Sequence, residues 1–257
     1  MKRTQHGFTL VELAIVLVII GLIIAGVLVG QDMIKAASVR ATIGQVEKYN
    51  AALNTFRNKY NGLPGDLPAT SATNFGMTTR SGAVGHGDGN RLLEGCSAGA
   101  LVAGCETVLF WRDLSFAGLI PDSMTTATDA LTQVAAGATN TVFPTSKLQS
   151  ASFTVFSASG QNYYELAGIT STDASGVYTL TSTITPAASF AMDSKMDDGS
   201  PITGTVIALG STTTLNVAAT PAVAAVGVCV DTATNAYNNS TQAYAESPAC
   251  QLRFRFN

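Results

Sequence analysis

Three aspartates in the second half of the chain could bind a cation. Asp193, Asp197 and Asp198 lie at positions i, i+4 and i+5, and a glycine follows them directly. Calcium in proteins takes about six to eight oxygen ligands, chiefly carboxylates and carbonyls, so this segment is a candidate calcium site. The same residues are also typical of a helix end followed by a solvated turn, and this structural interpretation is the favoured one.

Four cysteines could form two disulfide bonds or bind zinc. The simplest pairing is Cys96–Cys105 and Cys229–Cys250, although four cysteines allow three connectivities. The second pair is favoured because a predicted sheet would place residues 226–230 close to residues 252–256. Zinc is disfavoured because neither pair has CxxC spacing and the chain has only two histidines.

The sequence contains no recognisable catalytic constellation. His86 lies in a glycine-rich segment without a nearby nucleophile or a GxSxG motif, and His6 lies close to the N-terminus. A phosphate-binding loop and a dinucleotide-binding fingerprint are both missing. We therefore expect a protein that is not an enzyme and that needs no cofactor, the candidate calcium apart.

An uncharged apolar segment covers residues 13–30 and is long enough for one membrane pass. Lys2 and Arg3 precede it, which favours a cytoplasmic N-terminus. The whole chain is 46% hydrophobic and only 12% charged, with a net charge of −3, so we expect neither a disordered chain nor a nucleic-acid-binding protein. All four cysteines follow the apolar segment, which favours an oxidising compartment for the remainder of the chain.

The residues that lead into this segment are Gly7-Phe8-Thr9-Leu10-Val11-Glu12. They resemble the class III signal of type IV pilins and type II secretion pseudopilins, and the resemblance covers residues 1 to about 35. It implies that prepilin peptidase cuts between Gly7 and Phe8, that Phe8 is N-methylated and that residues 1–7 are a leader. It further implies that Glu12 pairs with the Phe8 amine of a neighbouring subunit during filament assembly.

Two other interpretations of the N-terminus stay open. In a plain signal anchor, Glu12 would lie in the headgroup zone of the membrane. In a conventional secretory signal, cleavage would fall near Ala36-Ala37. Neither alternative accounts for Gly7, Phe8 and Thr9 together.

A single long helix from Phe8 to Tyr60 is predicted to carry these residues. Residues 8–30 would lie in a membrane or a filament core, and residues 31–60 are amphipathic. Gly62 is predicted to be the C′ residue that follows the helix, and Pro64 prevents the helix from continuing. Its apolar stripe recurs at spacings of three and four residues: Val39, Thr42, Val46, Tyr49, Leu53, Phe56 and Tyr60.

Residues 61–257 are predicted to form a head domain. An irregular region precedes a helix over residues 107–120, in which Trp111, the one tryptophan, is assigned to the core. A short helix is expected over residues 189–196. The predicted strands of an antiparallel sheet are residues 153–158, 163–169, 177–184, 204–209, 226–230 and 252–256. The fold class is therefore α+β, a long N-terminal helix packed on a C-terminal antiparallel sheet, and the resemblance implies the same pilin-like layout.

The resemblance implies a structural subunit of a type IV pilus or a related filament. Its partners would be other pilin subunits, prepilin peptidase and the assembly platform of the inner membrane. The subunit would cross the inner membrane once with its head in the periplasm, and would then enter a pilus on the cell surface or a periplasmic pseudopilus. The alternatives are a type II secretion pseudopilin and a membrane-anchored adhesive or binding domain that does not assemble.

Overall fold

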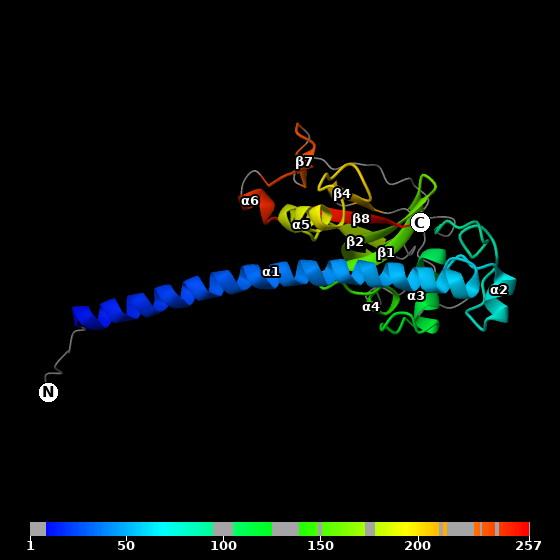
Figure 1. Cartoon of the computed structure of the whole chain (residues 1–257), viewed down its shortest axis with the longest axis horizontal. Coiled ribbons are helices and arrows are strands. Elements are labelled where there is room, and N and C mark those ends of the chain that lie inside the picture. The colour runs from blue at the N-terminus through cyan, green and yellow to red at the C-terminus, as the bar shows by residue number, and fades with distance from the viewer. Residues whose placement is uncertain are drawn as a thin grey trace. The chain divides into compact units, whose positions relative to one another are not determined.

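The computed structural model describes residues 9–94, 105–124, 139–148, 151–172, 178–210, 213–214, 229–231, 233–239 and 242–256. The chain divides into two compact units, Met1–Ser38 and Val39–Asn257. Helix α1 (Leu10–Tyr60) contributes to both units (Figure 1). The structure is α+β, with a long N-terminal helix and a C-terminal antiparallel sheet, as predicted.

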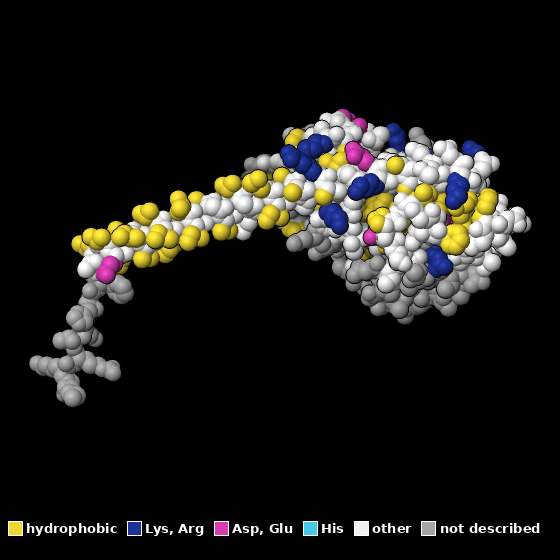
Figure 2. All heavy atoms as spheres, turned by 60° about the horizontal axis from the view of Figure 1, so that its bottom comes forward, with side chains coloured by type: hydrophobic (Ala, Val, Ile, Leu, Met, Phe, Trp, Pro, Cys, Tyr) yellow, Lys and Arg dark blue, Asp and Glu magenta, His cyan; other side chains and the backbone are white. Residues whose placement is uncertain are grey.

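The first unit consists of the apolar part of α1. Its large aliphatic side chains from Leu10 to Ile34 are exposed. Figure 2 shows them along the helix, with an acidic side chain close to its N-terminal end. Within the part of the chain that the structure describes, α1 is the one helix long and apolar enough to cross a membrane. A continuous apolar surface of this size is typical of membrane or protein contact.

The second unit begins with the amphipathic part of α1. The predicted stripe is confirmed, because all seven of its residues are buried. Tyr49 lies at the centre of an aromatic cluster, with ring centroids 4.9 Å from Trp111, 5.2 Å from Phe153 and 6.2 Å from Tyr164. Since edge-on aromatic contacts add to the gain from burial, this cluster fixes the helix against the sheet.

Three helices precede the sheet: α2 (Ala69–Asn74), α3 (Glu106–Phe116) and α4 (Thr139–Val142). α3 matches the predicted helix but ends four residues earlier, where Ala117 caps it and Gly118 adopts a φ of 67°. Trp111 is fully buried in the core, as predicted. The region before α3 is predicted to be irregular, and the structure places α2 within it.

A six-stranded antiparallel sheet forms the centre of the head. Its order is β4-β8-β2-β3-β5, and β1 also pairs with β2. The strands are β1 (Ser152–Ala158), β2 (Gln161–Thr172), β3 (Tyr178–Thr181), β4 (Val206–Gly210), β5 (Thr213–Thr214) and β8 (Cys250–Phe256). β1 and β2, which correspond to the predicted strands 153–158 and 163–169, form a hairpin with a tight turn at Ser159 and Gly160.

Three further elements lie after β3. α5 (Pro186–Met196) begins three residues before its predicted start, because the Thr185 side chain caps it and accepts from the N–H of Ala188. β6 (Val230–Asp231) pairs with β7 (Ala236–Tyr237) in a separate two-stranded sheet, and α6 (Gln242–Ala245) precedes β8. The prediction that residues 226–230 join the main sheet is wrong for Val230. β8 already has a hydrogen-bonded neighbour on each side, β2 and β4.

Candidate functional sites

The first candidate site is the start of α1. The N–H and the hydroxyl of Thr9 each donate to Glu12 Oε2 at 2.8 Å, and the N–H of Glu12 donates to Thr9 Oγ1 at 3.3 Å. This is a reciprocal capping box, which satisfies the first free N–H groups of the helix. Gly7 and Phe8 lie outside the described residues.

Glu12 is the single charged residue between Leu10 and Gly30. Its carboxylate is exposed at the beginning of an apolar surface. A carboxylate at the edge of a membrane-spanning segment is costly without a partner, so it is suited to binding a cationic group. Within one molecule, Thr9 provides neutral donors but no charge.

The three predicted aspartates lie together at the end of α5. Asp193, Asp197 and Asp198 each place a carboxylate oxygen within 4.8 Å of the others. Donors of the protein already contact them. Asp193 accepts from the N–H of Gly199 and from the Tyr237 hydroxyl. Asp197 accepts from the N–H groups of Thr205 and Val206. Asp198 accepts from the N–H of Ser200 and the hydroxyl of Thr203.

These bonds explain the loop that follows α5. The Asp197 carboxylate reaches the backbone N–H groups of Thr205 and Val206 because Gly204, at a φ of 83°, has no side chain in its path. The carboxylates therefore fold the loop by accepting hydrogen bonds, which fits the favoured helix-end interpretation. Calcium binding by these three aspartates stays the alternative interpretation.

We expect calcium to have no effect on the stability of this loop. The donors that contact the aspartates would have to be displaced before a cation could take the same oxygens. Thermal unfolding of the full chain in nonionic micelles should give the same midpoint with excess calcium and with excess EDTA. A midpoint that rises with calcium in the native chain, but not in Asp198→Asn, would establish the candidate calcium site instead.

A disulfide joins Cys229 to Cys250, one of the two predicted pairs, with Cα atoms 5.0 Å apart. It links the residue before β6 to the first residue of β8, so it connects the small sheet to the main one. The sequence predicts this bond from residues 226–230 and 252–256 being neighbours in one sheet. In the structure, Cys229 instead directly precedes β6 of the separate two-stranded sheet. Cys105 is also disulfide-bonded, and its predicted partner Cys96 lies outside the described residues.

A second acidic cluster joins the loops before α3 to the first residue of that helix. Asp66, Asp88 and Glu106 place carboxylate oxygens within 4.8 Å of one another, and the Asp66 and Glu106 side chains are buried. Asp66 accepts from the N–H groups of Gly89 and Arg91 at 2.7 and 2.6 Å. Glu106 accepts from those of Gly87 and Glu94, both at 2.8 Å. In this part of the head the two carboxylates therefore accept the backbone N–H hydrogen bonds that carbonyl groups accept in regular secondary structure.

Neither Asp66 nor Glu106 is recognisable as a site residue from the sequence. Their binding partners are backbone N–H groups 12 to 25 residues away, and no local spacing encodes such contacts. The available signal is the run of glycines at positions 85, 87 and 89. All three adopt positive φ, which brings successive N–H groups toward the carboxylates.

We expect this cluster to make the head less stable at alkaline pH. Burial raises the pKa of Glu106 to about 8 and that of Asp66 to about 6, against the opposing effect of their backbone hydrogen bonds. The folded state then holds protons that the unfolded chain releases. The free energy of unfolding should therefore fall as pH rises from about 5 to about 8. Glu106 alone contributes up to about 1.4 kcal/mol per pH unit to this fall.

Urea unfolding at pH 5, 6.5 and 8, followed by the fluorescence of Trp111, measures this dependence. Glu106→Gln should lower stability at pH 5, because an amide cannot accept both N–H bonds, and should flatten the decline toward pH 8. A Glu106→Gln variant with the native pH dependence would contradict the assignment.

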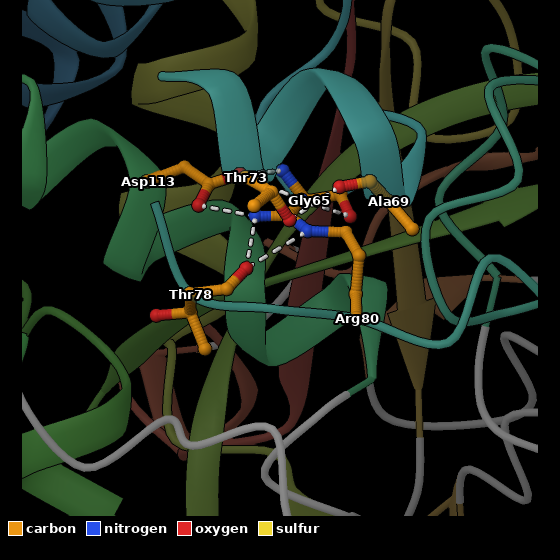
Figure 3. A network of polar contacts seen from close by, with 6 residues as sticks. All are labelled: Gly65, Ala69, Thr73, Thr78, Arg80 and Asp113. Atoms are coloured by element: carbon orange, nitrogen blue, oxygen red, sulfur yellow. Dashed lines mark hydrogen bonds and ion pairs between the residues drawn. The ribbon is translucent and has the colours of Figure 1, made fainter. Parts of the chain in front are cut away.

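A buried ion pair holds the loop after α2 against α3 (Figure 3). The Arg80 guanidinium donates to both carboxylate oxygens of Asp113, with Nη2 to Oδ1 at 3.0 Å and Nη1 to Oδ2 at 3.1 Å. The same guanidinium donates to the carbonyls of Gly65 and Thr78, and the N–H of Gly65 donates to Asp113 at 2.7 Å. Both charged side chains are almost fully buried, so all of these bonds form away from water.

Gly65 is part of this network for a steric reason. Its φ is 85°, and a side chain there would collide with the backbone of α3 at Glu106. The close approach lets the Gly65 N–H and C=O reach Asp113 and Arg80 at the same time. Neither charged residue was identified from the sequence, because 33 positions separate them.

Comparison with known proteins assigns the N-terminal segment. The model of the prokaryotic N-terminal methylation motif matches residues 2–28. No curated protein and no solved structure matches the chain. The motif includes Gly7, Phe8 and Glu12 and runs into the exposed apolar part of α1. Residues 2–28 therefore carry the prepilin-type signal that is the signature of type IV pilins and pseudopilins.

Proposed function

We propose that this chain is a prepilin-like structural subunit that assembles through α1 into a type IV pilus or a related filament. The observation that carries the proposal is the methylation motif at residues 2–28, which leads directly into the exposed apolar segment of α1 with its single carboxylate, Glu12. A structural subunit of this kind is not an enzyme.

The proposed maturation removes residues 1–7 as a leader. Prepilin peptidase cuts between Gly7 and Phe8, and the new amine of Phe8 is methylated. The apolar segment stays on the mature chain, where residues 8–30 anchor the subunit in the inner membrane and later line the filament core. Residues 61–257 form the head, exposed first in the periplasm.

Assembly then depends on charge at the start of α1. In the filament, the Glu12 carboxylate of one subunit pairs with the Phe8 amine of its neighbour. A buried polar pair stabilises one alignment of two apolar helices over the others, and setting such a register is the best-attested use of these pairs. Before assembly Glu12 accepts hydrogen bonds from Thr9, and on assembly it binds the Phe8 amine of the neighbouring subunit.

Mass spectrometry of the mature N-terminus tests the proposal. The chain is expressed with and without prepilin peptidase, and the expected product begins at N-methylated Phe8 only when the peptidase is present. Gly7→Val should block cleavage and leave the full precursor. Cleavage near Ala36-Ala37, or a precursor that the peptidase leaves intact, would overturn the proposal.

A second candidate is a pseudopilin of a type II secretion system. Many major type IV pilins have a proline about two thirds along the apolar segment, whereas the first proline of this chain that follows the segment is Pro64. The unbroken α1 favours this candidate. Electron microscopy of sheared cells separates the two, because a pilus gives long surface filaments at native expression. A membrane-anchored domain that does not assemble would give neither pili nor secretion-dependent filaments.

A further inference from the structure

A cavity of about 430 Å³ opens in the head, where the end of α1 meets the start of β2. The polar and aromatic side chains that line it are Arg57, Asn61, Arg91, Gln161, Asn162 and Phe256. Two of these carry a positive charge, and no acidic residue is among its lining residues. This is unusual in a chain with 17 acidic and 14 basic residues. A concave surface of one charge focuses its field on whatever enters.

The two arginines lack anionic partners within the described segments of the chain. The ion pairs Arg80–Asp113 and Arg253–Glu165 involve neither of them, and no described residue forms a hydrogen bond with the Arg57 or Arg91 guanidinium. Partial burial lowers the pKa of Arg57, and the positive charge of Arg91 lowers it further. The fold thus places two like charges close enough to repel each other across a cavity.

The backbone under Arg91 is fixed from both sides. Its N–H donates to Asp66 Oδ2 at 2.6 Å, and its C=O accepts from Asn162 Nδ2 at 2.9 Å. The Asn162 amide is itself held, because its Oδ1 accepts from the N–H of Leu93 at 2.9 Å. The backbone of Arg91 therefore holds its position in the wall of the cavity without help from a ligand, whereas its exposed side chain would become ordered only on binding.

Unusual backbone conformations gather at the same place. Of the four described non-glycine residues with positive φ, Asn61 and Arg91 line the cavity and Ser159 is adjacent to its wall. Their φ values are 52°, 71° and 50°, a region that costs free energy for residues with side chains. The end of α1 and the β1–β2 turn account for this conformation at Asn61 and Ser159, whereas at Arg91 the bonds to Asp66 and Asn162 enforce it.

We propose that this cavity is an oxyanion-binding site that takes a carboxylate or a phosphate group through Arg57 and Arg91. The planar fork of a guanidinium matches both groups in a two-point contact, and two such forks can hold one anion from two directions. The Asn61 side-chain amide adds a neutral donor. Leu63 and Phe256 provide an apolar wall for the body of a ligand that carries the anionic group. The site belongs to the head and is separate from the assembly segment of α1.

Isothermal titration of the full chain in nonionic micelles tests the site. Inorganic phosphate and propionate are titrated separately, with ionic strength held constant by sodium chloride. We expect saturable binding at one site per chain for at least one of the two anions. Preference for phosphate would indicate a phosphorylated ligand, and preference for propionate a carboxylated one; either result supports the site.

Substitutions at the two arginines give the decisive comparison. Arg57→Gln and Arg91→Gln should each weaken binding about tenfold or more, whereas Arg57→Lys, which keeps the charge and loses the fork, should weaken it less. Arg40→Gln is the matched control, because Arg40 is an exposed arginine ~25 Å away along the same helix. It should bind like the native chain.

Two results would overturn the proposal. One is the absence of saturable binding with both anions. The other is equal affinity in the native chain, Arg57→Gln and Arg91→Gln, which would assign the binding to another surface. Near-ultraviolet circular dichroism of each variant reports whether the packing of Trp111 is intact, so that lost binding is not confused with lost folding.

Discussion

Glu12→Ala should be cleaved and methylated normally but incorporated into filaments at least about tenfold less than the native chain. Cleavage takes place at Gly7 and Phe8, upstream of the substitution. Assembly loses the one negative charge at the start of α1, and with it the proposed partner of the neighbouring Phe8 amine. A cationic amine left unpaired among apolar helices is costly, so fewer subunits should leave the membrane.

Variants of the capping box separate the effect of the Glu12 charge on assembly from the effect of helix capping. Glu12→Gln retains an oxygen that can accept from Thr9 but has no charge, and it should assemble as poorly as Glu12→Ala. Thr9→Ala removes the hydroxyl and retains the charge, so it should assemble better than both. Glu47→Ala, at an exposed position of the same helix, is the matched control and should assemble normally.

Incorporation is measured by immunoblotting sheared filaments against total membrane protein, and methylation by mass spectrometry of the membrane fraction. Native levels of filaments from both Glu12 variants would contradict the proposed pairing. Poor assembly of Thr9→Ala together with normal assembly of Glu12→Gln would instead assign the effect to capping.

Removal of either partner of the Arg80–Asp113 pair should cost about 3 to 5 kcal/mol of the head's unfolding free energy. This is the usual effect of leaving one buried charge without its partner. Here the side chains are 0% and 1% exposed, so water cannot replace the lost bonds. Arg80→Met would leave the buried Asp113 carboxylate with the Gly65 N–H but no positive partner. Asp113→Leu would leave the Arg80 guanidinium with the carbonyls of Gly65 and Thr78 but no negative partner.

A double-mutant cycle tests the coupling between these two residues. Arg80→Met with Asp113→Leu should lose less stability than the sum of the single variants, by about 1 kcal/mol or more. Arg255→Met, at an exposed arginine of β8, should change stability by less than about 0.5 kcal/mol. Urea unfolding followed by Trp111 fluorescence provides all four values. Additive single effects would show that the two side chains act independently.

Patterns that repeat along the chain were predictable. The buried stripe of α1 follows from helical spacing, the β1–β2 hairpin from two alternating runs around a glycine turn, and the core position of Trp111 from its place on an amphipathic helix. Each of these depends on neighbours within a few positions. The N-terminal signal was also recognisable, since it consists of six adjacent residues.

Contacts between distant residues were not predictable in the same way. Alternation identifies a strand but not its partner, so the assignment of residues 226–230 to the main sheet failed at Val230. The Arg80–Asp113 pair and the Glu106 carboxylate depend on loops that return to α3 from positions 12 to 33 residues away. Likewise, the positive cavity combines α1, the loop at Arg91 and β2, which lie far apart in the sequence.

The position of β8 in the middle of the sheet has a consequence for biosynthesis. Residues 162–166 of β2 bond to residues 252–256, so one edge of β2 has no neighbour until the chain has been made to residue 256. An open strand edge invites pairing with other chains. During export the head must therefore be protected from aggregation for the time needed to deliver about 90 more residues. Closure of the sheet, and with it the Cys229–Cys250 disulfide, would mark the moment at which a subunit is ready for assembly.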